Sequence, residues 1–249
     1  MLHLSNNCIF SVAKCLGSVY CTGPFRATCK RVQSVTPAAP KKYKDAKEFI
    51  AHCCKRGDAA AFIKVYDAHK SEMSCSKLLT SVAKLRHNHI LRWMAEHAEL
   101  KYPEYMLYGA AKSKDVEQLH AVYAIYQNFI QRVGINQYNE ATFLLERGAG
   151  ETGSLLMCEE VLKITKSTTL NRFLKGASIN RQLELCRDLI SKGANSFGEM
   201  AYVACIEDSV EVFDLAVEHL GLDVCELICL NVLKSKVRAR IRELRANGP

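Results

Sequence analysis

Basic side chains gather near the end of the sequence, in the run LKSKVRARIREL from Leu233 to Leu244. Only Glu243 opposes them, so a helix over this run would present positive charge around most of its circumference. Phosphate groups of nucleic acids bind such surfaces. A solvated helix that caps the last repeat of an array would look similar, because Val237, Ile241 and Leu244 could pack inward. The cations are Lys234, Lys236, Arg238, Arg240, Arg242 and Arg245.

Three other groups could do chemistry, and each has a plainer interpretation. The run ERGAGETGS (Glu146 to Ser154) lacks the Gly-Lys-Ser/Thr that grips a nucleotide, so it predicts a flexible turn between helices. His87, His89 and Cys75 match no metal-ligand spacing. Tyrosine is enriched at binding surfaces, although two or three of the tyrosines must fill the core. These are Tyr102, Tyr105, Tyr108, Tyr123 and Tyr126.

No nucleophile with a neighbouring base, no paired carboxylates and no activated cysteine stand out in the sequence. We therefore expect no enzyme activity, no cofactor, no metal and no small-molecule substrate. The net charge of +8 favours anionic partners.

The elements that must position these residues follow a helix-turn-helix pattern that recurs about six times from Asp45 to Leu220. A short apolar helix precedes each polar turn, and a longer amphipathic helix follows it. The steps between turns are 29, 28, 36, 29 and 28 residues, and the longest step indicates an insertion near residues 129–138. The turns lie near Gly57-Asp58, His87-Asn88, Lys114-Asp115, Gly150-Glu151, Asn180-Arg181 and Asp208-Ser209.

The helix boundaries have capping signals. Asp58, Asp115 and Asp208 can each cap the second helix of a unit, and Gly193 and Gly221 can end one. Strand-like alternation is missing over any useful length. The fold class is therefore predicted to be all-α, an α-solenoid in which each unit buries its apolar face against the next unit.

Two runs resemble ankyrin repeats. QLELCRDLISKGAN (Gln182 to Asn195) is similar to the second helix and exit of that repeat, and AYVACIEDSVEVFDLAVEHLG (Ala201 to Gly221) is similar again. The Thr-Pro-Leu-His motif of the family is absent, and the step is shorter than the usual 33 residues. The resemblance implies paired helices without the ankyrin hairpin, and a protein-interaction adaptor.

Two runs also resemble pentatricopeptide repeats, which bind RNA. They are LNRFLKGASINRQLELCRDLISKG (Leu170 to Gly193) and LYGAAKSKDVEQLHAVYAIYQNF (Leu107 to Phe129). The resemblance implies that Asn171 could read a base in its unit, although the other units show no consistent equivalent.

The first 44 residues contain seven basic side chains and no acidic one, and Asp45 is the first carboxylate. This segment resembles a mitochondrial transit peptide, since Ile9 to Val19 can form an amphipathic helix. A plain basic tail is the alternative. The run VTPAAPKK (Val35 to Lys42) is typical of a linker.

Twelve cysteines are dispersed through the chain without any Cys-x-x-Cys pair. The pattern fits neither a disulfide framework nor a zinc module. Cys54, Cys158, Cys186 and Cys205 stand where a repeat would place a small buried residue, so we expect inert core thiols in a reducing compartment.

The sequence thus predicts a presequence-like segment and linker (1–40), a helical repeat array (45–221) and a basic C-terminal capping helix (222–249). We expect a non-catalytic protein of the mitochondrial matrix, an RNA-associated or structural subunit of a ribonucleoprotein such as the mitochondrial ribosome. Its partners would be RNA, ribonucleoprotein subunits or other proteins, and we expect no membrane insertion. The alternative is an ankyrin-like adaptor, with a cytoplasmic location.

Overall fold

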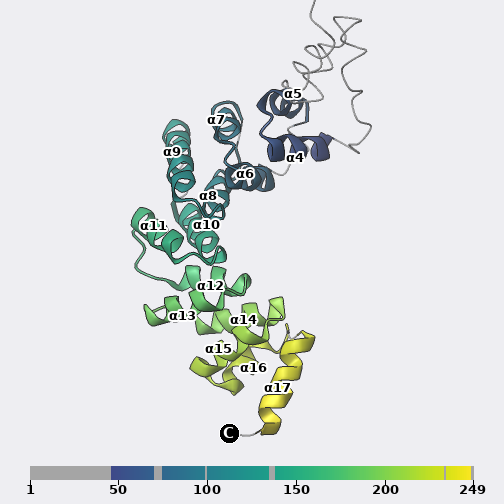
Figure 1. The fold of residues 1–249 in the computed structure, drawn as a ribbon, viewed down its shortest axis with the longest axis vertical. Coiled ribbons are helices and arrows are strands. Elements are labelled where there is room, and N and C mark those ends of the chain that lie inside the picture. Colours follow the sequence, from purple (N-terminus) through teal and green to yellow (C-terminus); the bar gives the residue numbers. More distant parts are fainter. Residues whose placement is uncertain (1–45, 70–74, 99, 135–137, 233, 248–249) are drawn as a thin grey trace, which may run out of the picture. The chain divides into compact units, whose positions relative to one another are not determined.

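The structure is a computed structural model that describes residues 46–69, 75–98, 100–134, 138–232 and 234–247 (Figure 1). Every regular element in these residues is a helix, which confirms the all-α fold class. The predicted presequence and linker lie outside the described residues. None of the described helices combines the length and apolar character that crossing a membrane requires. The chain forms two compact units, which divide between Pro103 and Glu104.

The described residues of the first unit form two helical pairs. In the first pair α4 (Ala46–Arg56) packs against α5 (Ala59–His69), and in the second α6 (Cys75–Lys84) packs against α7 (Asn88–His97). The α4 helix also contacts α6, and α5 contacts α7. The predicted cap is confirmed, since Asp58 Oδ1 accepts a bond of 3.0 Å from the backbone N–H of Ala61. The largest fully buried side chains here are Ile50, Phe62, Leu79, Ile90, Leu91 and Met94.

The described residues of the second unit form ten helices. Its first helices are α8 (Glu104–Ala111), α10 (Tyr138–Glu151), α12 (Asn171–Ile179), α14 (Phe197–Glu207) and α16 (Leu222–Cys229). Its second helices are α9 (Val116–Val133), α11 (Leu155–Thr165), α13 (Leu183–Ser191), α15 (Val210–Leu220) and α17 (Ser235–Asn247). Each first helix contacts the first helix of the next pair, and each second helix packs against its own partner (Figure 1).

The turn predicted at Gly150-Glu151 is wrong, because α10 continues through both residues to Glu151. The glycines that suggested a flexible turn are instead points of close helix contact. A Cβ at Gly150 would overlap the backbone carbonyl of Phe173 on α12, and a Cβ at Gly176 would overlap that of Arg147. Two backbones that approach so closely leave room only for glycine. The chain turns at residues 152–153 instead, and the hydroxyl of Ser154 caps α11.

The additional residues of the longest step lengthen two helices. The α9 helix has 18 residues and is followed at its C-terminal end by Gly134, whose φ is +69°, and α10 has 14 residues. Asp115 caps α9 as predicted, accepting a bond of 3.1 Å from the backbone N–H of Gln118.

Asp208 does not cap α15 as predicted. It adopts a left-handed conformation with φ +54° and ends α14, while its carboxylate turns toward α17. There Asp208 Oδ1 accepts bonds from the backbone N–H groups of Lys236 (2.9 Å) and Val237 (3.2 Å). One residue therefore ends one helix and caps another that begins 27 residues later.

Candidate nucleic-acid interface

The predicted basic run forms α17, which packs one face against α15 and α16. Val237 and Ile241 are buried, and Leu244 is half-buried. The apolar side of α17 therefore lies against α15 of the preceding pair and against its own partner α16. Val237 and Ile241 therefore point inward, whereas most of the cations of the run remain at the surface.

Arg240 and Arg245, two of the six predicted cations, form ion pairs with carboxylates of the neighbouring helices. Arg240 Nε donates to both carboxylate oxygens of Asp214 at 3.0 and 3.1 Å, and hydrogen bonds to Asp214 and Glu243 raise the pKa of Arg240. Arg245 bridges Asp223 and Glu226 at 2.9 and 2.6 Å. These two arginines attach α17 to α15 and α16, so they are the least suited to bind an outside phosphate.

The other four cations, Lys234, Lys236, Arg238 and Arg242, are exposed. Lys234 and Arg242 form no ion pair with any residue that the structure describes. Lys236 stands beside Asp208, whose pKa is lowered by its bonds to the start of α17 and by this cation, although partial burial opposes the shift. Arg238 and Arg242 are four residues apart on α17 and therefore share one helix face, and Lys234 stands just before the helix. We call these three exposed cations the basic stripe.

Asn171 does not belong to this surface. It begins α12, where its Nδ2 donates to Asn195 Oδ1 at 3.0 Å and its Oδ1 accepts from the backbone N–H of Asn195 at 2.9 Å. Both ends of the side-chain amide therefore fix the loop before α14. Asn171 is thus engaged in a contact within the protein that base reading would have to share or break.

Two buried carboxylates, which sequence reasoning missed, lie on α10. Glu151 accepts bonds from Lys112 Nζ (2.6 Å), Tyr108 Oη (2.7 Å) and Arg147 Nε (2.9 Å). Burial alone would raise the pKa of Glu151, but the bonds from Lys112, Tyr108 and Arg147 outweigh it and lower the pKa.

Glu146 is fully buried and bonds Thr165 Oγ1 (3.1 Å) and Arg172 (3.3 Å). Both oxygens of each carboxylate have partners, so neither is a ready acid or base for catalysis. The charged residues in ERGAGETGS signalled polarity, but the helical register that buries them was not readable.

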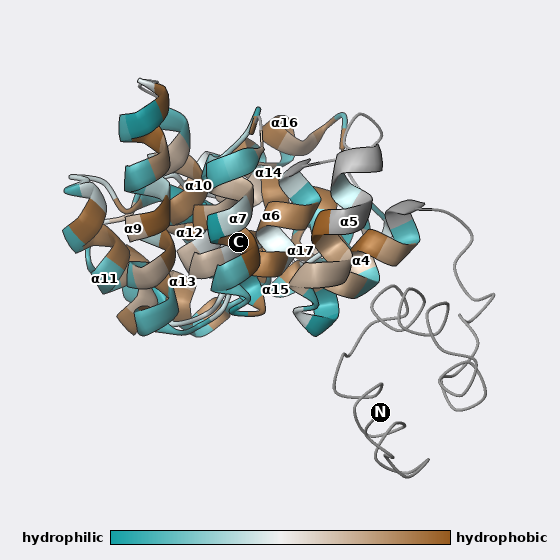
Figure 2. Cartoon of the chain, turned by 90° about the horizontal axis from the view of Figure 1, so that it is seen from above, coloured by the Kyte–Doolittle hydropathy of each residue, from teal (hydrophilic) through white to brown (hydrophobic). Residues whose placement is uncertain are grey.

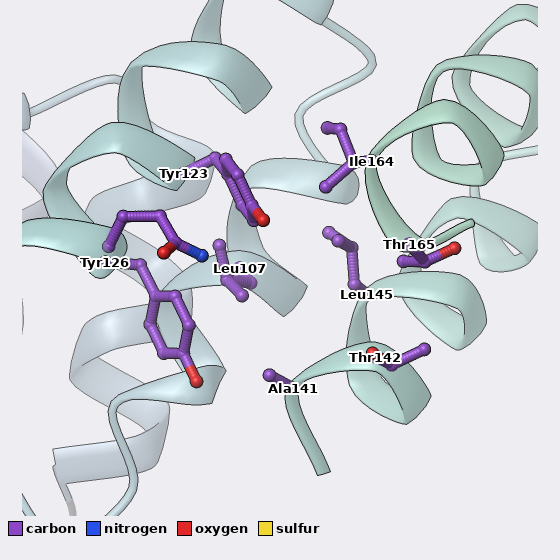
Figure 3. A pocket seen from close by; sticks show the side chains of 9 residues that line it. Leu107, Tyr123, Tyr126, Ala141, Thr142, Leu145, Ile164 and Thr165 are labelled. Carbon is purple, nitrogen blue, oxygen red and sulfur yellow. The ribbon is translucent and has the colours of Figure 1, made fainter. Parts of the chain in front are cut away.

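The tyrosines divide between core and surface. Tyr126 is buried and Tyr102 is 54% exposed. Tyr123 and Tyr126 help to line a hollow between α8, α9, α10 and α11 (Figure 3). Its volume of about 20 Å³ suits roughly one water molecule and is far below that of a ligand pocket. The hollow is lined by Leu107, Tyr123, Tyr126, Gln127, Ala141, Thr142, Leu145, Ile164 and Thr165.

His87 and His89 hold the turn after α4. His87 Nε2 lies 3.2 Å from the carbonyl oxygen of Lys55, and His89 Nε2 lies 2.9 Å from that of Gly57. Within the described ranges no three potential ligands gather to hold a metal ion. Seven described cysteines, among them the four expected in the core, are buried and free.

No protein-family model, no curated protein and no solved structure matches this chain. Its functional interpretation therefore rests on the residues and their geometry.

Proposed function

We propose that this chain is a non-catalytic helical-repeat protein that acts as an RNA-associated or structural subunit of a ribonucleoprotein such as the mitochondrial ribosome. The observation that carries the proposal is the basic stripe: Arg238 and Arg242 are exposed on a helix whose opposite side is buried, and the exposed Lys234 stands just before it. Backbone phosphates need such cations at the surface and no defined pocket.

Binding by this surface would recognise phosphates rather than bases. Lys ammonium groups and bidentate Arg guanidinium groups bind phosphate oxygens. Base reading in helical repeats instead needs polar side chains at fixed positions of each repeat. Asn171 was the one candidate for base reading, and its side-chain amide is hydrogen-bonded to Asn195. We therefore propose weak dependence on RNA sequence.

The mitochondrial part of the proposal rests on the acid-free segment before Asp45. Imaging of a C-terminally tagged chain, coupled to sedimentation with and without ribonuclease, tests it. A mitochondrial signal and a heavy particle that ribonuclease disperses support the proposal. A cytosolic signal that is indifferent to ribonuclease contradicts it.

The basic stripe is tested by RNA affinity measured against salt concentration. Neutralising Lys234, Arg238 and Arg242 together to Gln should reduce the slope of log K against log salt by about 2, since each lost phosphate contact removes about 0.7 for a single strand. A matched control neutralises Lys84, Arg92 and Lys166, which are also exposed. Equal slopes in the stripe variant and the wild type would contradict phosphate contact by the stripe.

The second candidate function is a protein-interaction adaptor. One observation favours it: between residues 104 and 233 the chain carries 18 Asp and Glu but only 11 Lys and Arg, and this excess repels RNA. Such a surface suits a basic protein partner. If the wild type shows no salt-dependent RNA binding but binds a basic protein, the adaptor function is the better proposal.

A further inference from the structure

The α16 helix is apolar on two opposite faces, and only one of them is covered. Cys225 and Cys229 are fully buried against the unit. On the other side Val224 is 46%, Leu227 70% and Leu230 58% exposed. Figure 2 colours most of α16 as hydrophobic. No residue that the structure describes covers these three aliphatic side chains, although the opposite face of the same helix is buried.

The three exposed residues form one continuous surface, here called the α16 face. Val224, Leu227 and Leu230 follow each other at three-residue steps, which places them side by side along the helix. Leu230 still has helical φ and ψ of −44° and −39°, so the row extends past the last residue of α16. A contiguous apolar surface of this kind marks an interaction site.

We propose that the α16 face binds the α16 face of a second copy of this chain, with the two helices antiparallel about a two-fold axis near Leu227. Such an interface must be complementary to itself. Apolar side chains in the middle of the helix meet that requirement, because each copy offers the same row to the other.

The charges at the two ends of α16 favour a second copy of this chain, in antiparallel orientation, as the partner. At the N-terminal end Asp223 and Glu226 share Arg245, which leaves a net negative charge, and the side chain of Asp223 is 88% exposed. Beyond the C-terminal end stands the exposed Lys234. Antiparallel pairing brings the acidic end of each copy to the basic end of the other, twice. The opposed helix dipoles add to the attraction.

The dimer should be weak. A standard interface buries about 800 Å² on each partner, and three aliphatic side chains supply only part of that area. We therefore expect dissociation in the micromolar range rather than the nanomolar range.

Sedimentation velocity of the full chain without RNA, over about 1 to 300 µM, tests the proposal. The wild type should shift from monomer to dimer. Leu227→Asp should weaken the dimer by at least about tenfold, because it places two carboxylates at the axis. Leu156→Asp on α11, at a residue that is 61% exposed, should leave the dimer unchanged. Circular dichroism of both variants checks that the fold is intact.

An exchange of charges separates this antiparallel pairing from other contacts. Asp223→Lys and Lys234→Asp should each weaken the dimer about 3- to 10-fold at low salt, and the double variant should restore it. Asp223→Lys also breaks the contact with Arg245, but the double variant keeps that break, so recovery reports only the contact between copies. A wild type that stays monomeric throughout, a dimer that Leu227→Asp leaves intact, or a double variant without recovery would each overturn the proposal.

Discussion

One residue, Glu151, joins parts of three helical pairs. Its side chain binds Tyr108 of α8, Lys112 just beyond α8, and Arg147 of its own helix. Its backbone carbonyl accepts a bond of 2.7 Å from Asn180 Nδ2 at the end of α12. Because the three side-chain donors are held around a buried acceptor, loss of the negative charge leaves two cations without their partner.

We predict that Glu151→Gln lowers the free energy of unfolding by about 2–4 kcal/mol, since breaking a largely buried ion pair from one side leaves uncompensated charge. Urea unfolding followed by circular dichroism measures the change. The matched control is Glu184→Gln, whose carboxylate is 89% exposed beside Arg187 and should change stability by less than about 0.5 kcal/mol. Equal effects of the two substitutions would contradict the role of the network.

The same network predicts a pH dependence. The pKa of Glu151 is lowered in the folded chain, so its stabilisation is complete above the ordinary glutamate pKa of about 4.5 and is lost as the pH falls through the folded value. The pKa of Tyr108 is raised, mainly by burial and then by the bond to Glu151, so its contribution is lost as the pH rises through the folded pKa. Unfolding free energies measured from pH 3 to 7 should fall more steeply below about pH 4.5 in the wild type than in Glu151→Gln. Parallel curves would show that Glu151 does not titrate as described.

At the scale of the elements, the sequence predicted where the second helices α5 and α9 begin more reliably than where the fourth turn lies. Amphipathic periodicity and the capping residues Asp58 and Asp115 placed α5 and α9. Gly150 misplaced the turn, because a glycine that ends a helix and a glycine that admits a neighbouring helix look alike in one sequence. The predicted cap of α15 by Asp208 failed for a related reason, since the helix that Asp208 caps, α17, is distant in the sequence.

Close contact between α10 and α12 leaves no room for a Cβ atom at Gly176. We predict that Gly176→Ala lowers the unfolding free energy by about 2–3 kcal/mol, because its Cβ would overlap the backbone carbonyl of Arg147. Gly198→Ala is the matched control within a helix, since its Cβ would meet Ile228 Cδ1 at an ordinary 3.5 Å. That change should be neutral or stabilise by up to about 1 kcal/mol. Urea unfolding of both variants measures the two changes in free energy. A Gly176→Ala variant as stable as the wild type would show that α10 and α12 can move apart without loss of stability.

At the scale of the whole molecule, the division between Pro103 and Glu104 separates units of unequal size. A chain of about 150 residues buries enough surface to fold alone, whereas one of about 60 residues is marginal. The regular step of the sequence pattern passes through this division without a change, so the boundary was not predictable from periodicity. The sequence also could not predict which cations of α17 form ion pairs. The pair between Arg240 and Asp214, for example, depends on the tertiary contact between α17 and α15.

We predict that residues 104–249 expressed alone fold into a helical unit with a cooperative thermal transition. The full chain should then show two transitions, of which the later matches that of the fragment. Circular dichroism and calorimetry measure both. A fragment without cooperative unfolding would mean that the second unit depends on the first.

The buried thiols can report local unfolding of the helices that carry them. Burial raises the pKa of Cys54 and Cys158 to about 12 and that of Cys186 and Cys225 to about 11, so a thiol reagent can modify them only when the surrounding helices part. They lie on α4, α11, α13 and α16. The rate at which each is labelled in the native state therefore reports how often its own helix opens, and the order of labelling ranks the helical pairs by local stability.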